Sequence, residues 1–211
     1  DSKPGLQLLH CVAMEGVQGG ESVLVDALAA AHAMKELSPD LFDILTHCEA
    51  TFVKQRHNAD LVYTRPHVEQ DSQGTVIAVH WSPPFMGPVR IPQHLVKDYF
   101  LAHAVYERLV DNKIGSSSSS SSNTAGHLPI SDDLSRALSD YAQAHTWQRK
   151  LQPGEILIFN NQRLLHGRRA FVRDPTSAAF DRHLVGCYVD MDDVLNHYRQ
   201  LRRSRKGLPR Y

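Results

Sequence analysis

The stretch LQPGEILIFNNQRLLHGRR, residues 151–169, decides the fold class of this chain. Pro153-Gly154 is typical of a tight turn, and residues 156–159 have the apolar composition of a buried strand. A short polar turn then leads to a second strand, residues 163–165. His166 follows directly and precedes a glycine, so we expect its imidazole to lie at a strand end and to point into a cavity.

Further strands and helices are predicted on both sides of this stretch. The predicted strands are residues 6–13, 52–53, 61–63, 74–81, 147–151, 155–159 and 183–189. The predicted helices are residues 26–37, 38–45, 92–110, 132–145 and 192–202. We expect residues 16–20 to form a turn. In helix 26–37, the apolar face is predicted to comprise Val25, Leu28, Ala29, Met34 and Leu37.

The order of these elements is strands, helices, strands. It lacks the alternation of strands and helices with Gly-rich phosphate turns, which argues against a Rossmann fold. A mainly β chain with flanking helices, a β-sandwich or jelly roll, fits this order better. Residues 115–127 enclose an unbroken serine tract, which cannot bury apolar area and is predicted to be a flexible surface loop.

Composition narrows the class of protein. A length of 211 residues fits one domain, and 42% hydrophobic with 22% charged residues is typical of a soluble globular protein. Lys plus Arg equals Asp plus Glu at 23 each, which gives no reason to expect a polyanionic partner. No apolar run reaches the roughly 18 residues of a membrane span. Cys11, Cys48 and Cys187 lie far apart, which argues for a reducing compartment.

His166 and Arg182 carry the chemical interpretation. Taken alone, His166 would be a core histidine bonded to a backbone carbonyl, and Arg182 a surface or salt-bridged arginine. Together, a metal-binding histidine on one strand and an arginine on a later strand form half of an iron and oxo-acid site. Two histidines and a carboxylate leave iron open positions, and a planar guanidinium binds the carboxylate of an oxo acid with two hydrogen bonds.

The chain resembles the γ-butyrobetaine and trimethyllysine dioxygenase family, within the taurine-dioxygenase-like Fe(II)/2-oxoglutarate oxygenases. The resemblance covers nearly the whole chain outside the serine tract, and its most distinctive block is FNNQRLLHGR, residues 159–168. The other matching pieces are residues 4–11, 19–22, 25–26, 153–154, 182–184, 186–188 and 192–195.

This resemblance implies a double-stranded β-helix with Fe(II), 2-oxoglutarate as co-substrate and ascorbate as reductant. It makes His166 the distal iron ligand, and Arg182 the group that holds the distal carboxylate of 2-oxoglutarate. Ser22 matches a hydroxyl that assists that carboxylate, or is a turn hydroxyl bonding its own backbone. Leu9 matches a residue lining the oxo-acid pocket, although ordinary core would explain it too. Tyr188 matches one wall of an aromatic cage for a trimethylammonium group, or is a plain strand tyrosine.

The resemblance also implies something that this sequence lacks. The other two iron ligands are expected as a His-x-Asp dyad before the Pro-Gly strand, hence upstream of Asp1. His47-Cys48-Glu49 has the right form but falls where the family has no ligand. We therefore interpret residues 1–211 as an N-terminally truncated, partial catalytic domain, and we expect it to be inactive alone.

The leading interpretation of function is hydroxylation of γ-butyrobetaine to L-carnitine. Trimethyllysine 3-hydroxylation by the same mechanism is the alternative, and a non-catalytic cupin-like binding domain is a further one. The expected partners are a small trimethylammonium substrate, 2-oxoglutarate and O2, with neither nucleic acid nor membrane, and a homodimer stays open. The basic C-terminus is interpreted as a helix-dipole arrangement with a solvated tail. A cytoplasmic location is expected, with the mitochondrion as the alternative.

Overall fold

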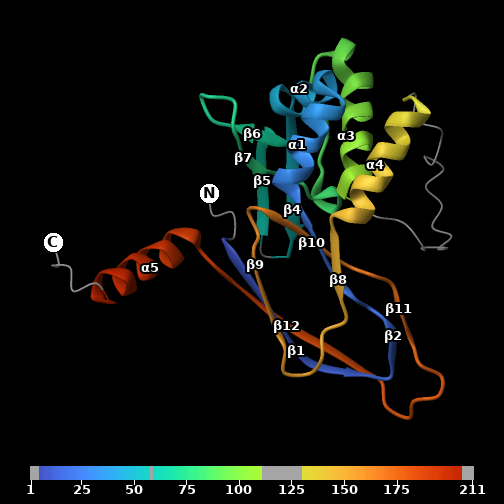
Figure 1. The fold of residues 1–211 in the computed structure, drawn as a ribbon, viewed down its shortest axis with the longest axis vertical. Coiled ribbons are helices and arrows are strands. Elements are labelled where there is room, and N and C mark those ends of the chain that lie inside the picture. The colour runs from blue at the N-terminus through green and yellow to red at the C-terminus, as the bar shows by residue number, and fades with distance from the viewer. Residues whose placement is uncertain (1–4, 58, 111–129, 206–211) are drawn as a thin grey trace. The chain divides into compact units, whose positions relative to one another are not determined.

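A computed structural model describes residues 5–57, 59–110 and 130–205 (Figure 1). The chain forms two compact units. We call residues 1–24 with 148–211 the sheet unit, and residues 25–147 the insert unit. The predicted serine loop, residues 115–127, lies outside the described residues.

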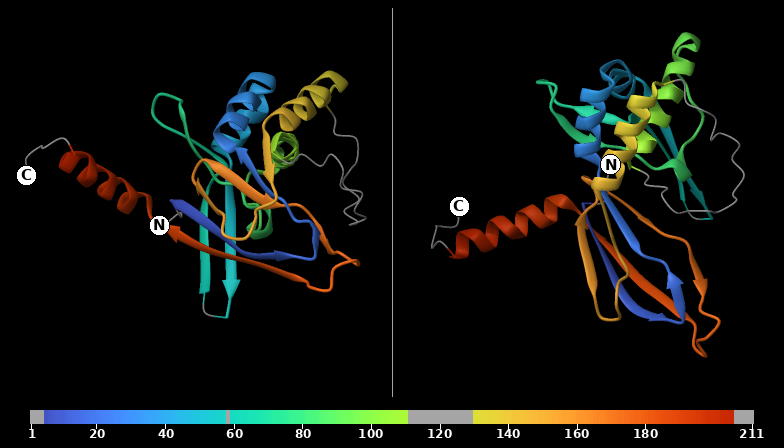
Figure 2. Two further views of the ribbon diagram at one scale, coloured as in Figure 1. Left: turned by 60° about the horizontal axis from the view of Figure 1, so that its bottom comes forward. Right: turned by 45° about the vertical axis from the view of Figure 1, so that its right-hand side comes forward.

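The sheet unit is built around β1 (Leu6–Glu15), the central strand of an antiparallel sheet. Its neighbours are β12 (Asp181–Val189) on one side and β9 (Ile156–Asn160) on the other (Figures 1 and 2). The chain forms a strand here because residues alternate in environment: Gln7 and Cys11 are buried, whereas His10 and Val12 are exposed. A register shift between Cys11 and Ala13 brings Met14 opposite Arg182.

Two further pairings involve the remaining strands. A second three-stranded sheet has the order β10 (Leu164–Arg168), β3 (Ser22–Asp26), β8 (Thr146–Arg149), and β11 (Phe171–Arg173) pairs with β2 (Val17–Gly19). The predicted turn at residues 16–20 is therefore wrong in part, because it contains β2. Its glycines explain the compact path, since Gly16, Gly19 and Gly20 all have positive φ angles of 59°, 78° and 79°.

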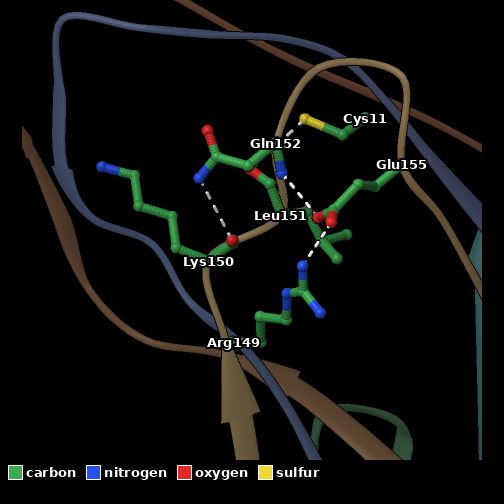
Figure 3. Close-up of polar contacts among 6 residues, drawn as sticks. All are labelled: Cys11, Arg149, Lys150, Leu151, Gln152 and Glu155. Carbon is green, nitrogen blue, oxygen red and sulfur yellow. Dashed lines mark hydrogen bonds and ion pairs between the residues drawn. The ribbon is translucent and has the colours of Figure 1, made fainter.

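The loop from β8 to β9 is tied to Cys11 (Figure 3). The amide of Cys11 donates to the Glu155 carbonyl at 2.9 Å, and the amide of Gly154 donates to the Cys11 carbonyl at 2.8 Å. The Glu155 carboxylate accepts from the Gln152 amide at 2.9 Å and pairs with Arg149. The predicted Pro153-Gly154 turn is confirmed, and these bonds fix where β9 begins.

The insert unit holds most of the helices and two hairpins. The helices are α1 (Ala27–Leu37), α2 (Pro39–His47), α3 (Val96–Val110) and α4 (Asp132–Ala144), with short helices η1 (Pro83–Phe85) and η2 (Gln93–Leu95). The hairpins pair β4 (Glu49–Arg56) with β5 (Ala59–Pro66), and β6 (Val68–Gln70) with β7 (Val76–Val79). The core of the insert unit is rich in aromatic rings, with Phe42, Phe52, Tyr99 and Tyr106 almost fully buried.

The last helix, α5 (Met191–Arg205), follows β12 and buries none of its residues. Acidic Asp192 and Asp193 occupy its first turn and Arg202, Arg203 and Arg205 its last, as the helix dipole favours. No helix in the described ranges is long and apolar enough to cross a bilayer. The predicted order of strands, helices and strands holds only in part, because the four strands β4 to β7 lie between α2 and α3.

Candidate functional site

One face of the sheet β12–β1–β9 carries two of the residues that the sequence singles out, Leu9 and Tyr188. Directly opposed residues of antiparallel strands point to the same face. Gln7 lies opposite Tyr188 on β12 and Phe159 on β9, and Leu9 lies opposite Gly186 and Leu157. We call this side of the sheet the site face.

Leu9 is half-buried in the second of these rows. A Cβ added to Gly186 would lie 3.1 Å from Leu9 Cδ2, so the leucine side chain occupies the space beside the glycine. The pairing therefore brings Leu9 and Tyr188, both singled out by the sequence, onto the same face.

His166 lies within β10, so its predicted place at a strand end is wrong. The strand continues through Arg168, and the Arg169 amide then donates to the Glu21 carbonyl at 2.9 Å. The imidazole packs against Phe159 of the site face, with ring centroids 5.1 Å apart. Residue 166 is exposed overall, yet partial burial of the ring lowers the pKa of His166, which favours the neutral imidazole that metals bind.

Arg182 is an arginine without a carboxylate partner among the described residues. Its Nε is buried and has no hydrogen-bond partner within those ranges. Its Cζ lies 5.0 Å from the centroid of the Phe171 ring. Burial lowers the pKa of Arg182 and the positive charge of Arg168 lowers it further, which shows that this cation sits in an unfavourable environment. An anionic ligand would relieve that unfavourable environment.

Ser22 is buried at the start of β3, two residues after Gly20. A Cβ on Gly20 would lie 3.4 Å from Arg182 Nε, so the backbone before Ser22 runs close to the arginine. This proximity is compatible with the hydroxyl role that the resemblance implies.

Tyr188 is 58% exposed on the site face. Its neighbour Gln7 is 4% exposed, and Gln7 Oε1 has no hydrogen-bond partner among the described residues. A buried amide oxygen without a partner is costly. The sequence reasoning assigned no role to Gln7 or Phe159. The available signal was that Gln7, a polar residue, lies two and four positions before Leu9 and Cys11, so that in a strand all three would point to the same face.

The residues present fit an anion better than they fit a metal centre. Arg182 offers a guanidinium to a carboxylate. His166 offers one nitrogen, but the described parts of the chain hold no group of three His, Cys, Asp or Glu residues that could bind a metal ion. The described residues alone do not make a three-ligand iron site.

Comparisons with known proteins give the family of the chain. The family model described as "Taurine catabolism dioxygenase TauD, TfdA family" matches residues 1–188. Gamma-butyrobetaine dioxygenase of Pseudomonas sp. (strain AK-1) is 29% identical over 201 residues, covering 95% of this chain and 43% of the relative. Mitochondrial trimethyllysine dioxygenase of Bos taurus is 30% identical over 200 residues, covering 93% and 39%. The chain thus spans less than half the length of these relatives.

Solved structures share the fold. A putative alpha-ketoglutarate-dependent taurine dioxygenase from Burkholderia xenovorans has a TM-score of 0.53 at 17% identity, covering 90% of this chain and 56% of that one. An asparagine oxygenase in complex with Fe(II), 2S,3S-3-hydroxyasparagine and succinate has a TM-score of 0.54 at 15% identity, covering 90% and 46%. At these identities the likeness concerns the fold alone.

Proposed function

Because the chain belongs to the taurine catabolism dioxygenase TauD, TfdA family, we propose that it is part of an Fe(II)/2-oxoglutarate-dependent oxygenase that hydroxylates γ-butyrobetaine to L-carnitine. We further propose that the sheet unit contributes to a double-stranded β-helix. The observation that carries the proposal is Arg182, a partly buried guanidinium whose Nε is unpaired within the described residues and which lies beside a second cation.

In this proposal Arg182 binds the distal carboxylate of 2-oxoglutarate. Two N–H groups of one guanidinium match the two oxygens of a carboxylate, and desolvation strengthens their attraction. The Ser22 hydroxyl donates a hydrogen bond to the same carboxylate, and Leu9 lines the space beside the carbon chain of 2-oxoglutarate. Leu9 excludes water from that space because it is apolar.

His166 is the proposed distal iron ligand. When bound, iron supplies the oxidising chemistry, with dioxygen as co-substrate and ascorbate as reductant. Phe159 orients the imidazole by packing against it. The lowered pKa of His166 keeps its nitrogen lone pair available at neutral pH. The remaining ligands, a His-x-Asp dyad, are not among the residues described.

Tyr188 is the proposed contact for the trimethylammonium group. A quaternary ammonium donates no hydrogen bond, so an aromatic face is the means of binding it. The exposed Tyr188 ring offers such a face. Trimethyllysine is the second candidate substrate, favoured by the 30% identity to the Bos taurus enzyme. A non-catalytic cupin-like domain would have no use for both His166 and Arg182.

The proposal is tested by turnover of the protein encoded by the complete gene. With Fe(II), ascorbate, O2 and 2-oxoglutarate, we expect γ-butyrobetaine to be converted to L-carnitine while 2-oxoglutarate is converted to succinate and CO2. NMR should show succinate and L-carnitine in equal amounts. Product from trimethyllysine alone would select the alternative substrate. No succinate with either compound, in protein that binds iron, would favour the non-catalytic alternative. The cytoplasm stays the proposed compartment, with the mitochondrion as alternative.

A further inference from the structure

Two cationic side chains lie against the aromatic ring of Phe171. Arg168 Cζ lies 4.3 Å from the ring centroid and Arg182 Cζ lies 5.0 Å from it. Arg168 comes from β10 and Arg182 from β12, so residues of two different sheets meet at a residue of β11. Such contacts are attractive because a ring face carries partial negative charge.

We infer that Phe171 is a positioning residue that holds the Arg182 guanidinium ready for an anionic ligand, and that Arg168 strengthens the binding of that anion through its charge. The inference deepens the proposed function and rests on it in naming the ligand as the carboxylate of 2-oxoglutarate. The cluster of Arg168, Phe171 and Arg182 is called the arginine cluster below.

The backbone around Phe171 holds the ring firmly. Phe171 pairs with Gly19 in the β2–β11 ladder, and the Gly20 amide donates to the Ala170 carbonyl at 3.0 Å. A Cβ on Gly19 would lie 2.5 Å from the Ala170 oxygen, and one on Gly20 would lie 3.3 Å from Phe171 Cβ. Both glycines have positive φ angles, 78° and 79°, so few other residues would allow this close approach.

The backbone at Gly20 also lies close to the Nε atom of Arg182. A Cβ on Gly20 would lie 3.4 Å from Arg182 Nε, the nitrogen that is buried without a partner in the described ranges. Water therefore does not reach Nε, and the ring covers the guanidinium. The two Nη nitrogens form the other end of the group, and they are the donors left for a carboxylate. A guanidinium held in place loses less entropy when it binds.

The charges of the arginine cluster favour an anion. Both guanidinium groups lie against the Phe171 ring, and the pKa of Arg182 is lowered by burial and by the charge of Arg168, so the two groups repel each other. No acidic residue pairs with Arg182 in the described part of the chain. A carboxylate bound to Arg182 would convert that repulsion into attraction to both cations.

The first experiment follows Arg182 without any ligand. The Nε–H of arginine gives its own signal in a proton–nitrogen NMR spectrum, and the full chain is compared with Phe171→Leu and Phe171→Tyr. We expect the Arg182 Nε–H to exchange slowly in the wild type and in Phe171→Tyr, and at least tenfold faster in Phe171→Leu. Phe180→Leu is the matched control, since Phe180 is 47% exposed in the same unit, and it should leave the rate unchanged.

The second experiment measures binding of 2-oxoglutarate by calorimetry, with the same substitutions in the protein encoded by the complete gene. We expect Phe171→Leu to weaken binding about tenfold, the range for loss of a partly desolvated cation–π contact, and Phe171→Tyr to restore it. Arg168→Gln should weaken binding several-fold and flatten its dependence on salt, whereas Arg168→Lys should restore both.

The outcomes separate this inference from the proposed function. An unchanged Arg182 exchange rate in Phe171→Leu overturns the positioning role, whatever the affinity for 2-oxoglutarate. Equal affinity of Phe171→Leu and wild type overturns it too. Faster exchange in a protein whose wild type binds no 2-oxoglutarate would support the positioning of Arg182 but remove 2-oxoglutarate as its ligand, and the proposed function would fail with it.

Discussion

At the scale of single residues, Tyr188 offers an exposed aromatic ring on the site face, opposite the buried Gln7. We predict that Tyr188→Ala weakens binding of γ-butyrobetaine by about 0.5–2 kcal/mol, the range of cation–π contacts. Tyr188→Phe should retain most of the affinity, because the ring face remains. The KM values for substrate and for 2-oxoglutarate decide the matter, and a rise confined to 2-oxoglutarate would contradict the role.

Some of these residues could be predicted from the sequence, whereas others could not. Arg182 and His166 could be singled out because a guanidinium is able to bind an anion and an imidazole a metal, and Tyr188 because the chain resembles a known family. Phe171 could not, because a phenylalanine beside an arginine in space is separated from it by eleven positions in sequence. Gln7 had a signal in its alternation with the neighbouring residues of β1, but only the structure shows that its buried oxygen has no hydrogen-bond partner among the described residues.

At the scale of elements, α1 depends on the cap that Asp26 forms. Asp26 Oδ1 accepts hydrogen bonds from the amides of Leu28 and Ala29, both at 3.1 Å. We predict that Asp26→Ala lowers the free energy of unfolding by about 0.5–2 kcal/mol, and that Asp26→Asn loses less. Urea unfolding measures both, and equal losses would show that the charge of Asp26, rather than its cap, stabilises the helix.

The existence of α1 was predictable, but the face it buries was not. Helix formers and the cap residue place it at Ala27–Leu37, close to the predicted 26–37. Its buried residues are Ala27, Ala30, Ala31 and Met34, whereas the predicted face included Leu37, which is 38% exposed. The reason is packing, because small alanines allow neighbouring helices to approach closely. A prediction from hydrophobicity alone favours leucines over alanines as the buried residues.

At the scale of the whole molecule, two histidines of the insert unit make stability depend on pH. His67 is fully buried; its Nδ1 donates to the His80 carbonyl at 2.9 Å and its Nε2 accepts from the Tyr99 hydroxyl at 2.8 Å. Burial lowers the pKa of His67 to about 4, and likewise that of His103. Both histidines are therefore neutral in the folded protein at neutral pH.

The sign of the effect follows from these lowered pKa values. The unfolded chain binds a proton at each histidine near pH 6.5, before the folded chain does, so stability is fully present above pH 6.5 and falls as the pH drops toward about 4. Each group contributes at most about 1.4 kcal/mol per pH unit in that window. His67→Gln should flatten the dependence, and His197→Gln, at an exposed position of α5, should not. An unchanged slope in His67→Gln would refute the assignment.

The places of most helices and strands could be predicted because local periodicity indicates them. The two compact units, residues 1–24 with 148–211 and residues 25–147, could not. That division depends on which strands pair across more than a hundred residues, such as β1 with β9 and β12, and no local pattern encodes such pairings.

The apparent KM for 2-oxoglutarate of Arg182→Ala, in the protein encoded by the complete gene, tests the central claim most directly. We predict a strong rise, because a carboxylate loses its guanidinium at a cost of about 2–5 kcal/mol, which is roughly 30-fold to several thousand-fold. The KM for γ-butyrobetaine should stay nearly constant. An unchanged KM for 2-oxoglutarate together with impaired γ-butyrobetaine binding would contradict the account, since Arg182 would then bind the substrate carboxylate.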